Sequence, residues 1–297
     1  MRRRLVPAAV LLGLTAVAVT GWMTRSAGRG LVTNPAFSRP VPERTPADLG
    51  LAYQSVYVIA ADGFKTVGWY LPGENGALVL VQHGYKAHRG QVLPVAAMLR
   101  RHGYGVLVMS TRGHDRSDGE LITFGVQEMK DLAAWHALAL TLAGVDPRRI
   151  GMFGSSMGGS LAIQYAADHR DIRAVVADSA FSSLDDTVST SVLHQTGLPA
   201  FPFAPLVVFW AERQAGFDSA TIDAKRWIGR LSPRPVLLLQ GGRDTFITPA
   251  SGRLLYDAAR EPKELWFDPD VGHTLFSRDR AEEFEQRVGG FFERYLK

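Results

Sequence analysis

The chain has 297 residues, a net charge of +4 at pH 7 and no cysteine. Without cysteine it has no disulfide, no cysteine nucleophile and no thiolate metal site. The basic residues are scattered and form no stripe interleaved with aromatic residues, so nucleic-acid binding is unsupported. No P-loop, no H-E-x-x-H and no dinucleotide-binding glycine motif followed by an acidic residue is present, so no cofactor and no metal is implied.

The N-terminal segment is apolar and follows three arginines. Residues 5–23 carry no charge, and a helix of that length spans about 28 Å, enough to cross the hydrocarbon core of a bilayer. We therefore expect residues 1–23 to form an uncleaved signal anchor. Two alternatives are a cleaved signal with its site at residues 16–18, which would give a secreted protein, and a helix buried in the domain.

The orientation of this anchor follows from its flanking charges. Arg2, Arg3 and Arg4 outweigh Arg25 and Arg29 on the other side of the apolar run. The more basic flank stays in the cytoplasm, so we expect a membrane-anchored protein whose following domain lies outside the cytoplasm. The following segment is rich in Pro, Arg, Ser and Gly and is typical of a linker. The predicted boundaries are therefore an anchor over 1–23, a linker over 24–50 and one domain over 51–297.

Strands and helices alternate through the predicted domain. This alternation predicts an α/β fold with a mostly parallel, eight-stranded sheet and helices on both faces. The expected strands are 51–59 and 66–71, which form an opening hairpin, and then 77–82, 104–109, 150–153, 172–177, 236–240 and 264–267. The expected helices are 92–101, 126–142, 157–168, 251–260 and 280–295.

The pattern G-x-S-x-G occurs at residues 154–158, between an apolar strand and a predicted helix. In this context the pattern is typical of a nucleophile elbow, a tight turn that exposes a serine hydroxyl at the edge of a sheet. The nucleophile would be Ser156. A side chain at Gly154 or Gly158 would collide where strand and helix cross closely. Without a base and an acid elsewhere in the chain, the same pattern would be an ordinary glycine-rich turn.

The regular alternation breaks once, over residues 181–231. This insertion contains a strongly apolar run at 198–210 that is interrupted by prolines. We expect a cap or lid here. Its apolar run forms either a substrate wall, which would face the membrane, or a helix that packs on the core.

An acyl-transfer serine needs a base, and the base needs an acid that orients it. Asp244 follows the strand at 236–240 and His273 follows the strand at 264–267, so both lie where active sites collect in open sheets. Their order after Ser156 is the one typical of this arrangement. The other seven histidines lie on helices, in loops away from strand ends or before the serine. Asp178, at the end of another strand, is the rival acid.

The negative charge that develops on the substrate oxygen needs backbone N–H donors. One is expected from Met157, the residue after the nucleophile. The other is expected from Tyr85, in the loop that follows the strand at 77–82.

On these residues the chain resembles the α/β-hydrolase superfamily, and among its members the bacterial serine hydrolases of the serine-aminopeptidase and acyl-thioesterase-like branch. The resemblance covers about residues 51–297 and includes H-G-Y at 83–85, S-T-R-G-H-D-R-S-D-G at 110–119, G-G-R-D at 241–244 and G-H at 272–273. It implies the same nucleophile, acid, base and oxyanion donors. Asp115 stands where the family usually has glycine, and aspartate tolerates the left-handed turn geometry required there.

The sequence therefore predicts a serine hydrolase that cleaves an acyl ester, thioester or amide through an acyl-enzyme, with esters favoured. The expected substrate is a small or lipid-like acyl compound, and the sequence gives no oligomeric state. Aspartate-nucleophile chemistries are disfavoured by the serine at position 156. Two alternatives stay open. One is a serine aminopeptidase-type peptidase, and the other is a membrane-tethered, non-catalytic binding protein on a hydrolase fold.

Overall fold

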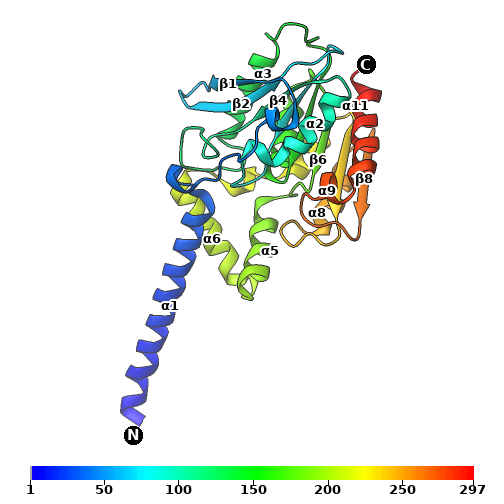
Figure 1. The fold of residues 1–297 in the computed structure, drawn as a ribbon. Coiled ribbons are helices and arrows are strands. Elements are labelled where there is room, and N and C mark those ends of the chain that lie inside the picture. Colours follow the sequence, from blue (N-terminus) through cyan, green and yellow to red (C-terminus); the bar gives the residue numbers. More distant parts are fainter. Residues whose placement is uncertain (1) are drawn as a thin grey trace.

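The computed structural model describes the backbone of residues 2–297 and the side chains of residues 10–297, so Met1 of the predicted anchor lies outside the described residues. One eight-stranded sheet forms the centre of the domain, and a long N-terminal helix projects from it (Figure 1). The predicted fold class, an α/β fold with a mostly parallel sheet, is confirmed.

The sheet has the strand order β1-β2-β4-β3-β5-β6-β7-β8. β2 runs antiparallel to both of its neighbours, and every other pair is parallel. All eight strands coincide with predicted ones. They are β1 (Gln54–Ile59), β2 (Lys65–Leu71), β3 (Leu78–Gln82), β4 (Gly105–Met109), β5 (Ile150–Ser155), β6 (Ile172–Asp178), β7 (Val236–Gly241) and β8 (Lys263–Asp268).

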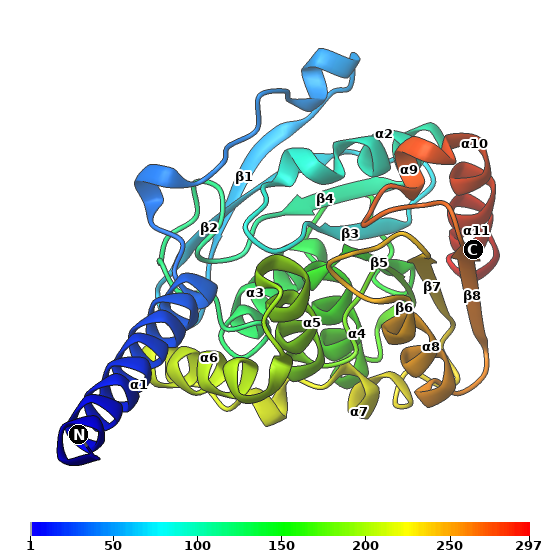
Figure 2. The same ribbon diagram turned by 90° about the horizontal axis from the view of Figure 1, so that it is seen from below.

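The helices cover both faces of the sheet (Figure 2). One face is covered by α3 (Glu128–Ala139), α4 (Met157–Asp168), α7 (Ala224–Ile228) and α8 (Pro249–Ala258). The other is covered by α2 (Leu93–Arg101), which follows the turn η3 (Arg89–Val92), and by the C-terminal helices. These are α9 (Phe276–Asp279), α10 (Ala281–Phe284), the π-helical turn η5 (Glu285–Gly289) and α11 (Gly290–Tyr295).

The central strands are apolar along their whole length because both of their faces are buried. In β3, Leu78 and Leu80 pack into the cluster on one face, while Val79 and Val81 pack into the cluster on the other. Side chains alternate between the faces of a strand, so a strand covered on both sides requires a continuous apolar run. This requirement explains why β3, β4 and β5 were readily predicted.

The N-terminal helix α1 (Arg2–Val32) continues beyond the predicted anchor. Its last two turns pack against α6 (Ala200–Ala215), where a Cβ on Gly28 would lie 2.6 Å from the carbonyl oxygen of Val207. The structure therefore corrects the linker prediction for 24–50, because its first part is helical. Close helix packing stabilises a sequence whose glycines otherwise favour an irregular segment.

The remainder of the predicted linker lies along the domain surface, with two short helical turns, η1 (Ala36–Ser38) and η2 (Pro46–Leu49). Asn34 connects the start of this segment to the domain through two hydrogen bonds. Its backbone N–H donates to the carbonyl oxygen of Glu120 at 2.8 Å, and its side-chain amide donates to that of Gly113 at 2.8 Å. These bonds fix the end of α1 against the loop that follows β4.

The predicted cap contains α5 (Leu184–Thr196) and α6, which form a V that projects from the same side of the domain as α1 (Figure 1). Ser183 begins α5 by accepting a hydrogen bond from the backbone of Asp186, and Gly197 ends it in the left-handed conformation. The chain bends by 118° between the two helices. The turn η4 (Ser219–Thr221) then leads to α7, which packs on α4 and α8 within the main domain.

The apolar run at 198–210 lies mostly in α6, which packs on the core as one of the two interpretations predicts, while the substrate wall stays a prediction. One face packs into the core through Ala204, Val207, Val208 and Ala211. The other face leaves Phe201 and Phe209 exposed.

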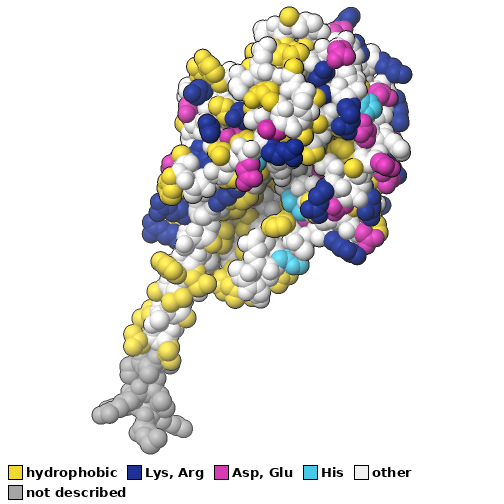
Figure 3. Space-filling model, in the orientation of Figure 1, with side chains coloured by type: hydrophobic (Ala, Val, Ile, Leu, Met, Phe, Trp, Pro, Cys, Tyr) yellow, Lys and Arg dark blue, Asp and Glu magenta, His cyan; other side chains and the backbone are white. Residues whose placement is uncertain are grey.

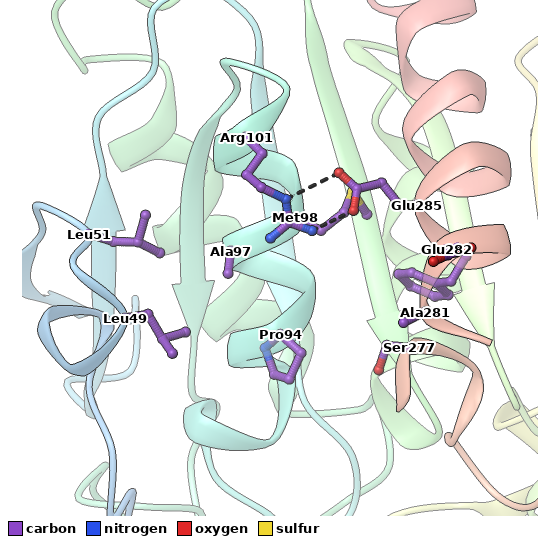
Figure 4. Close-up of a pocket in the computed structure, with 11 residues that line it drawn as sticks. Leu49, Leu51, Pro94, Ala97, Met98, Arg101, Ser277, Ala281, Glu282 and Glu285 are labelled. Atoms are coloured by element: carbon purple, nitrogen blue, oxygen red, sulfur yellow. Dashed lines mark hydrogen bonds and ion pairs between the residues drawn. The ribbon is translucent and has the colours of Figure 1, made fainter. Parts of the chain in front are cut away.

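A cavity of about 460 Å³ lies between α2, the segment at 49–51 and the helices α9 and α10 (Figure 4). Arg101 of α2 forms an ion pair with Glu285 at its edge. None of the predicted site residues lines this cavity. It lies at the junction where the segment before β1 meets the C-terminal helices.

Candidate active site

The serine turn joins β5 to α4 and has the strained geometry expected of a nucleophile elbow. Ser156 has φ 55° and ψ −119°, a backbone conformation that residues other than glycine rarely adopt. A Cβ on Gly154 would lie 2.0 Å from the carbonyl oxygen of Gly158, and one on Gly158 would lie 2.5 Å from that of Gln82. Both glycines are therefore required for the close crossing of strand and helix, as predicted.

Three of the predicted residues form a continuous chain of hydrogen bonds. His273 Nε2 lies 2.9 Å from Ser156 Oγ, and His273 Nδ1 lies 2.6 Å from Asp244 Oδ2. An ionised carboxylate only accepts hydrogen bonds, so Nδ1 carries the proton and Nε2 is left as the acceptor for the serine hydroxyl. The imidazole is thus oriented to remove a proton from Ser156.

The carboxylate of Asp244 is held rigidly at the carboxyl end of β7. Its Oδ1 accepts hydrogen bonds from the backbone N–H groups of Phe246 and Ile247 at 2.9 and 2.8 Å. The side chain is buried. Since Oδ1 has backbone partners, Oδ2 is the oxygen that faces His273.

The loop that carries His273 is fixed by a residue that the sequence did not single out. The backbone N–H of Thr274 donates to Ser179 Oγ at 3.1 Å, and Ser179 Oγ donates to Asp178 Oδ1 at 3.1 Å. Asp178, the rival acid, therefore supports the loop through Ser179, and its carboxylate makes no hydrogen bond to His273 among the described residues.

Asp178 is buried near Asp244 and His273. Burial, with a further contribution from the nearby Asp244, raises the pKa of Asp178 from 3.8 to about 7. Between these two values the folded protein keeps a proton that the unfolded chain releases, so the stability of the fold decreases as pH rises through this window. Above the folded-state pKa the loss of stability is complete and no longer changes with pH.

Asp178→Asn should therefore stabilise the protein by an amount that grows from about pH 4 to about pH 7 and is constant above it. The amide oxygen still accepts the hydrogen bond from Ser179. Thermal unfolding of wild type and variant across this pH range measures the effect. Asp257→Asn on α8 is the control: it removes only an exposed ion pair with Arg253, so any trend with pH should be small and opposite in sign. A stabilisation independent of pH would contradict the titration of Asp178.

The predicted oxyanion donors lie beside the serine. Met157 follows Ser156 directly, and Gly84 brings the loop after β3 so close that its Cβ would lie 3.1 Å from Ser156 Cβ. Within residues 2–297, the backbone N–H groups of Tyr85 and Met157 donate to no protein acceptor. Both are thus available to a substrate oxygen.

The loop that carries Tyr85 depends on two residues outside the predicted set. Gln91 Oε1 accepts the Gly84 N–H at 2.7 Å. His83 is fully buried, and burial lowers its pKa to about 4, so it is neutral near pH 7.

Asp115 has φ 51° in the neighbouring loop, which confirms that aspartate adopts the left-handed geometry at this position.

The serine opens into a pocket of about 630 Å³. One wall is aromatic, where Tyr85 stacks on Phe124 with ring centres 5.3 Å apart. Another wall comes from α5. A third comes unexpectedly from α1, through Ala27, Gly30 and Leu31. This third wall is not predictable from the sequence, since residues 27–31 fall within the predicted linker.

The same end of α1 is hydrogen-bonded to the loop that carries the predicted oxyanion donor. The hydroxyl of Tyr85 donates to the carbonyl oxygen of Leu31 at 2.6 Å. Lys86 Nζ donates to the carbonyl oxygen of Gly30 at 2.6 Å. The carboxyl end of α1 is therefore part of the structure around Ser156.

Known proteins resemble this chain along most of its length. The sequence profile of the serine aminopeptidase (S33) family matches residues 73–205, which include Ser156. The structure of the esterase Pf2001 from Pyrococcus furiosus has a TM-score of 0.75 at 27% identity and covers 90% of this chain and 99% of its own.

Two further relatives are known by sequence. The uncharacterized protein Rv2307c of Mycobacterium tuberculosis is 29% identical over 277 residues, which is 92% of this chain and 89% of its own. The alpha/beta hydrolase domain-containing protein WAV2 of Arabidopsis thaliana is 27% identical over 250 residues, which is 77% and 74% of the two chains. With the strand order and the serine turn described above, these similarities show that the chain belongs to the α/β-hydrolase superfamily.

Proposed function

We propose that the protein is a serine esterase that cleaves acyl esters through a covalent acyl-enzyme on Ser156. The observation that carries this proposal is the position of His273, whose two ring nitrogens lie 2.9 Å from Ser156 Oγ and 2.6 Å from Asp244 Oδ2. A nucleophile, its base and an orienting acid in this arrangement are the requirements of acyl transfer.

In the first half of the reaction, Ser156 Oγ attacks the ester carbonyl carbon and its proton passes to His273 Nε2. The N–H groups of Tyr85 and Met157 bind the oxyanion that forms. Asp244 stabilises the protonated imidazole. The intermediate then collapses, the bond to the leaving alcohol breaks, and His273 returns the proton to that alcohol. Water repeats the same steps on the acyl-enzyme and releases the acid.

The lining of the pocket favours esters over the substrates of an aminopeptidase. An aminopeptidase binds a free ammonium group, which needs a carboxylate partner when it is removed from water. None of the described lining residues is Asp or Glu, and the charged residue Lys86 is a cation. The apolar walls and the similarity to the esterase Pf2001 support an uncharged acyl group.

A fluorophosphonate probe tests the proposal. Wild type is expected to be labelled at Ser156, with the adduct located by peptide mass spectrometry, and to hydrolyse short p-nitrophenyl esters. His273→Ala should abolish both reactions because the hydroxyl is then no longer deprotonated. Labelling at another residue would contradict the assignment of the nucleophile. No turnover of any ester would favour the non-catalytic binding protein.

We further propose that α1 is an uncleaved membrane anchor with the domain outside the cytoplasm. Residues 10–32 form a helix that is long and apolar enough to cross a membrane. Its exposed part carries large apolar side chains, among them Leu11, Leu12 and Val17. The apolar stretch continues beyond the potential cleavage site at 16–18, and the basic N-terminal flank favours the proposed orientation.

Alkaline carbonate extraction is expected to leave the full-length protein in the membrane pellet. Protease added to intact spheroplasts should remove the domain. A soluble product trimmed at its N-terminus would show a cleaved signal, and a domain protected in intact spheroplasts would show the reverse orientation.

A further inference from the structure

We propose that the cap tip, defined as residues 193–205, enters the membrane beside α1, and that the pocket accepts the acyl chain of a lipid ester from the adjacent leaflet. The proposal rests on the esterase activity and the membrane anchor proposed above. It assigns a second membrane-contacting element and a substrate class to the same site.

The cap tip has the composition of a segment that contacts lipid. From residue 187 to residue 211 the chain contains no Asp, Glu, Lys or Arg. At the tip, Leu193 is 51% exposed and Phe201 is 79% exposed. Exposed apolar side chains that gather on one projecting element mark a surface that contacts a membrane or another apolar partner.

The occupant is identified as a membrane by the position of the tip. Figure 1 shows that the V of α5 and α6 points in the same direction as the exposed part of α1. Figure 3 shows hydrophobic side chains on both projections and Lys and Arg side chains where α1 enters the domain. A bilayer crossed by α1 would therefore meet the tip as well.

Cationic and aromatic side chains lie at the junction of α1 and α6. Arg25 lies over the ring of Trp210 at 5.6 Å, and Arg213 lies over the ring of Phe209 at 5.0 Å. Two arginines and a tryptophan at this junction fit the level of lipid head groups, where cations meet phosphate and an indole ring is half-immersed. The tip extends beyond this junction toward the N-terminal end of α1 (Figure 1).

The pocket beside Ser156 lies between α1 and the α5 helix of the cap. Ala27 and Leu31 of α1 and Val188 and Val192 of α5 line it together with Ser156. An ester whose carbonyl carbon lies at Ser156 Oγ would extend its acyl chain along these four apolar side chains, while Thr187 and Ser191 add hydroxyl groups to the α5 wall. The two elements that wall the pocket thus also lead to the membrane, which provides a lateral path for a lipid.

The absence of cysteine from the sequence gives a clean test of the immersion of the tip. A spin label is attached to Phe201→Cys in the full-length protein in liposomes. Val17→Cys in α1 is the reference within the bilayer, and Phe267→Cys, exposed on β8, is the reference in water. The label at 201 should collide more with oxygen than with a nickel chelate, as at 17. Behaviour like that at 267 would overturn the proposal.

Activity in the same liposomes tests the substrate. Phe201→Asp should lower hydrolysis of a fluorogenic diacyl lipid by about tenfold or more, because a charge at the tip opposes immersion. Hydrolysis of soluble p-nitrophenyl butyrate should change little, since Phe201 does not line the pocket. The matched variant Phe267→Asp should alter neither reaction.

The outcomes separate the two proposals. Wild type that cleaves p-nitrophenyl butyrate but not the lipid would overturn the lipid substrate and leave the esterase intact. Equal lipid hydrolysis by wild type and Phe201→Asp would overturn the role of the tip. Wild type that cleaves neither ester would refute the esterase itself.

Discussion

Ser156→Ala is expected to lower kcat for p-nitrophenyl esters by about six orders of magnitude. The variant keeps the oxyanion donors and the pocket but has no atom that can form the acyl-enzyme. Only water remains as a nucleophile, and His273 no longer has a hydroxyl to deprotonate at 2.9 Å. Steady-state hydrolysis, with the protein purified free of other esterases, measures the loss.

Ser155→Ala is the matched control, because Ser155 is the preceding residue and is also buried. It should retain activity within about tenfold, since a residue outside the reacting set contributes only through local packing. If Ser155→Ala loses as much as Ser156→Ala, the turn rather than the hydroxyl at 156 explains the loss. Circular dichroism of both variants checks that the fold is kept.

Asp244→Asn is expected to lower kcat by about four orders of magnitude. The amide oxygen can still accept the N–H groups of Phe246 and Ile247, so the loop keeps its shape. The amide nitrogen, however, is then directed at His273 Nδ1 as a donor. It favours the tautomer that carries its proton on Nε2, which cannot accept the proton of Ser156.

Asp178→Asn is the comparison for this variant. Its carboxylate binds Ser179 rather than His273, so we expect a loss smaller than about tenfold. Measuring kcat for both variants over the same pH range separates the two aspartates. A large loss for Asp178→Asn with a small one for Asp244→Asn would place the orienting acid on β6.

Much of the arrangement around the serine was predictable, because it depends on local sequence and chain order. Apolar runs predicted β5 and β7, and the spacing of Gly154, Ser156 and Gly158 predicted the turn between β5 and α4. Asp244 and His273 are predictable because each follows a strand in the expected order. The structure brings the last two together with Ser156 although 117 positions separate the serine from the histidine.

The supporting residues were not predictable, because their roles depend on contacts between distant segments. Gln91 and Ser179 are ordinary polar residues in the sequence, and only the fold places them against Gly84 and Thr274. The largest difference between the prediction and the structure is the end of α1, which is helical where a linker is predicted. Gly28 favours an irregular segment on local propensity, yet the close approach of Val207 makes glycine the residue that fits a helix there.

The hydrogen bond between the Tyr85 hydroxyl and the Leu31 carbonyl limits where the chain can be shortened for biochemical work. A truncation at residue 51, the start of the predicted domain, would leave the mostly buried Tyr85 hydroxyl without its acceptor and remove one pocket wall. A soluble form designed for crystallisation should therefore begin just before Thr24, so that it loses the exposed apolar turns and retains the docked end of the helix.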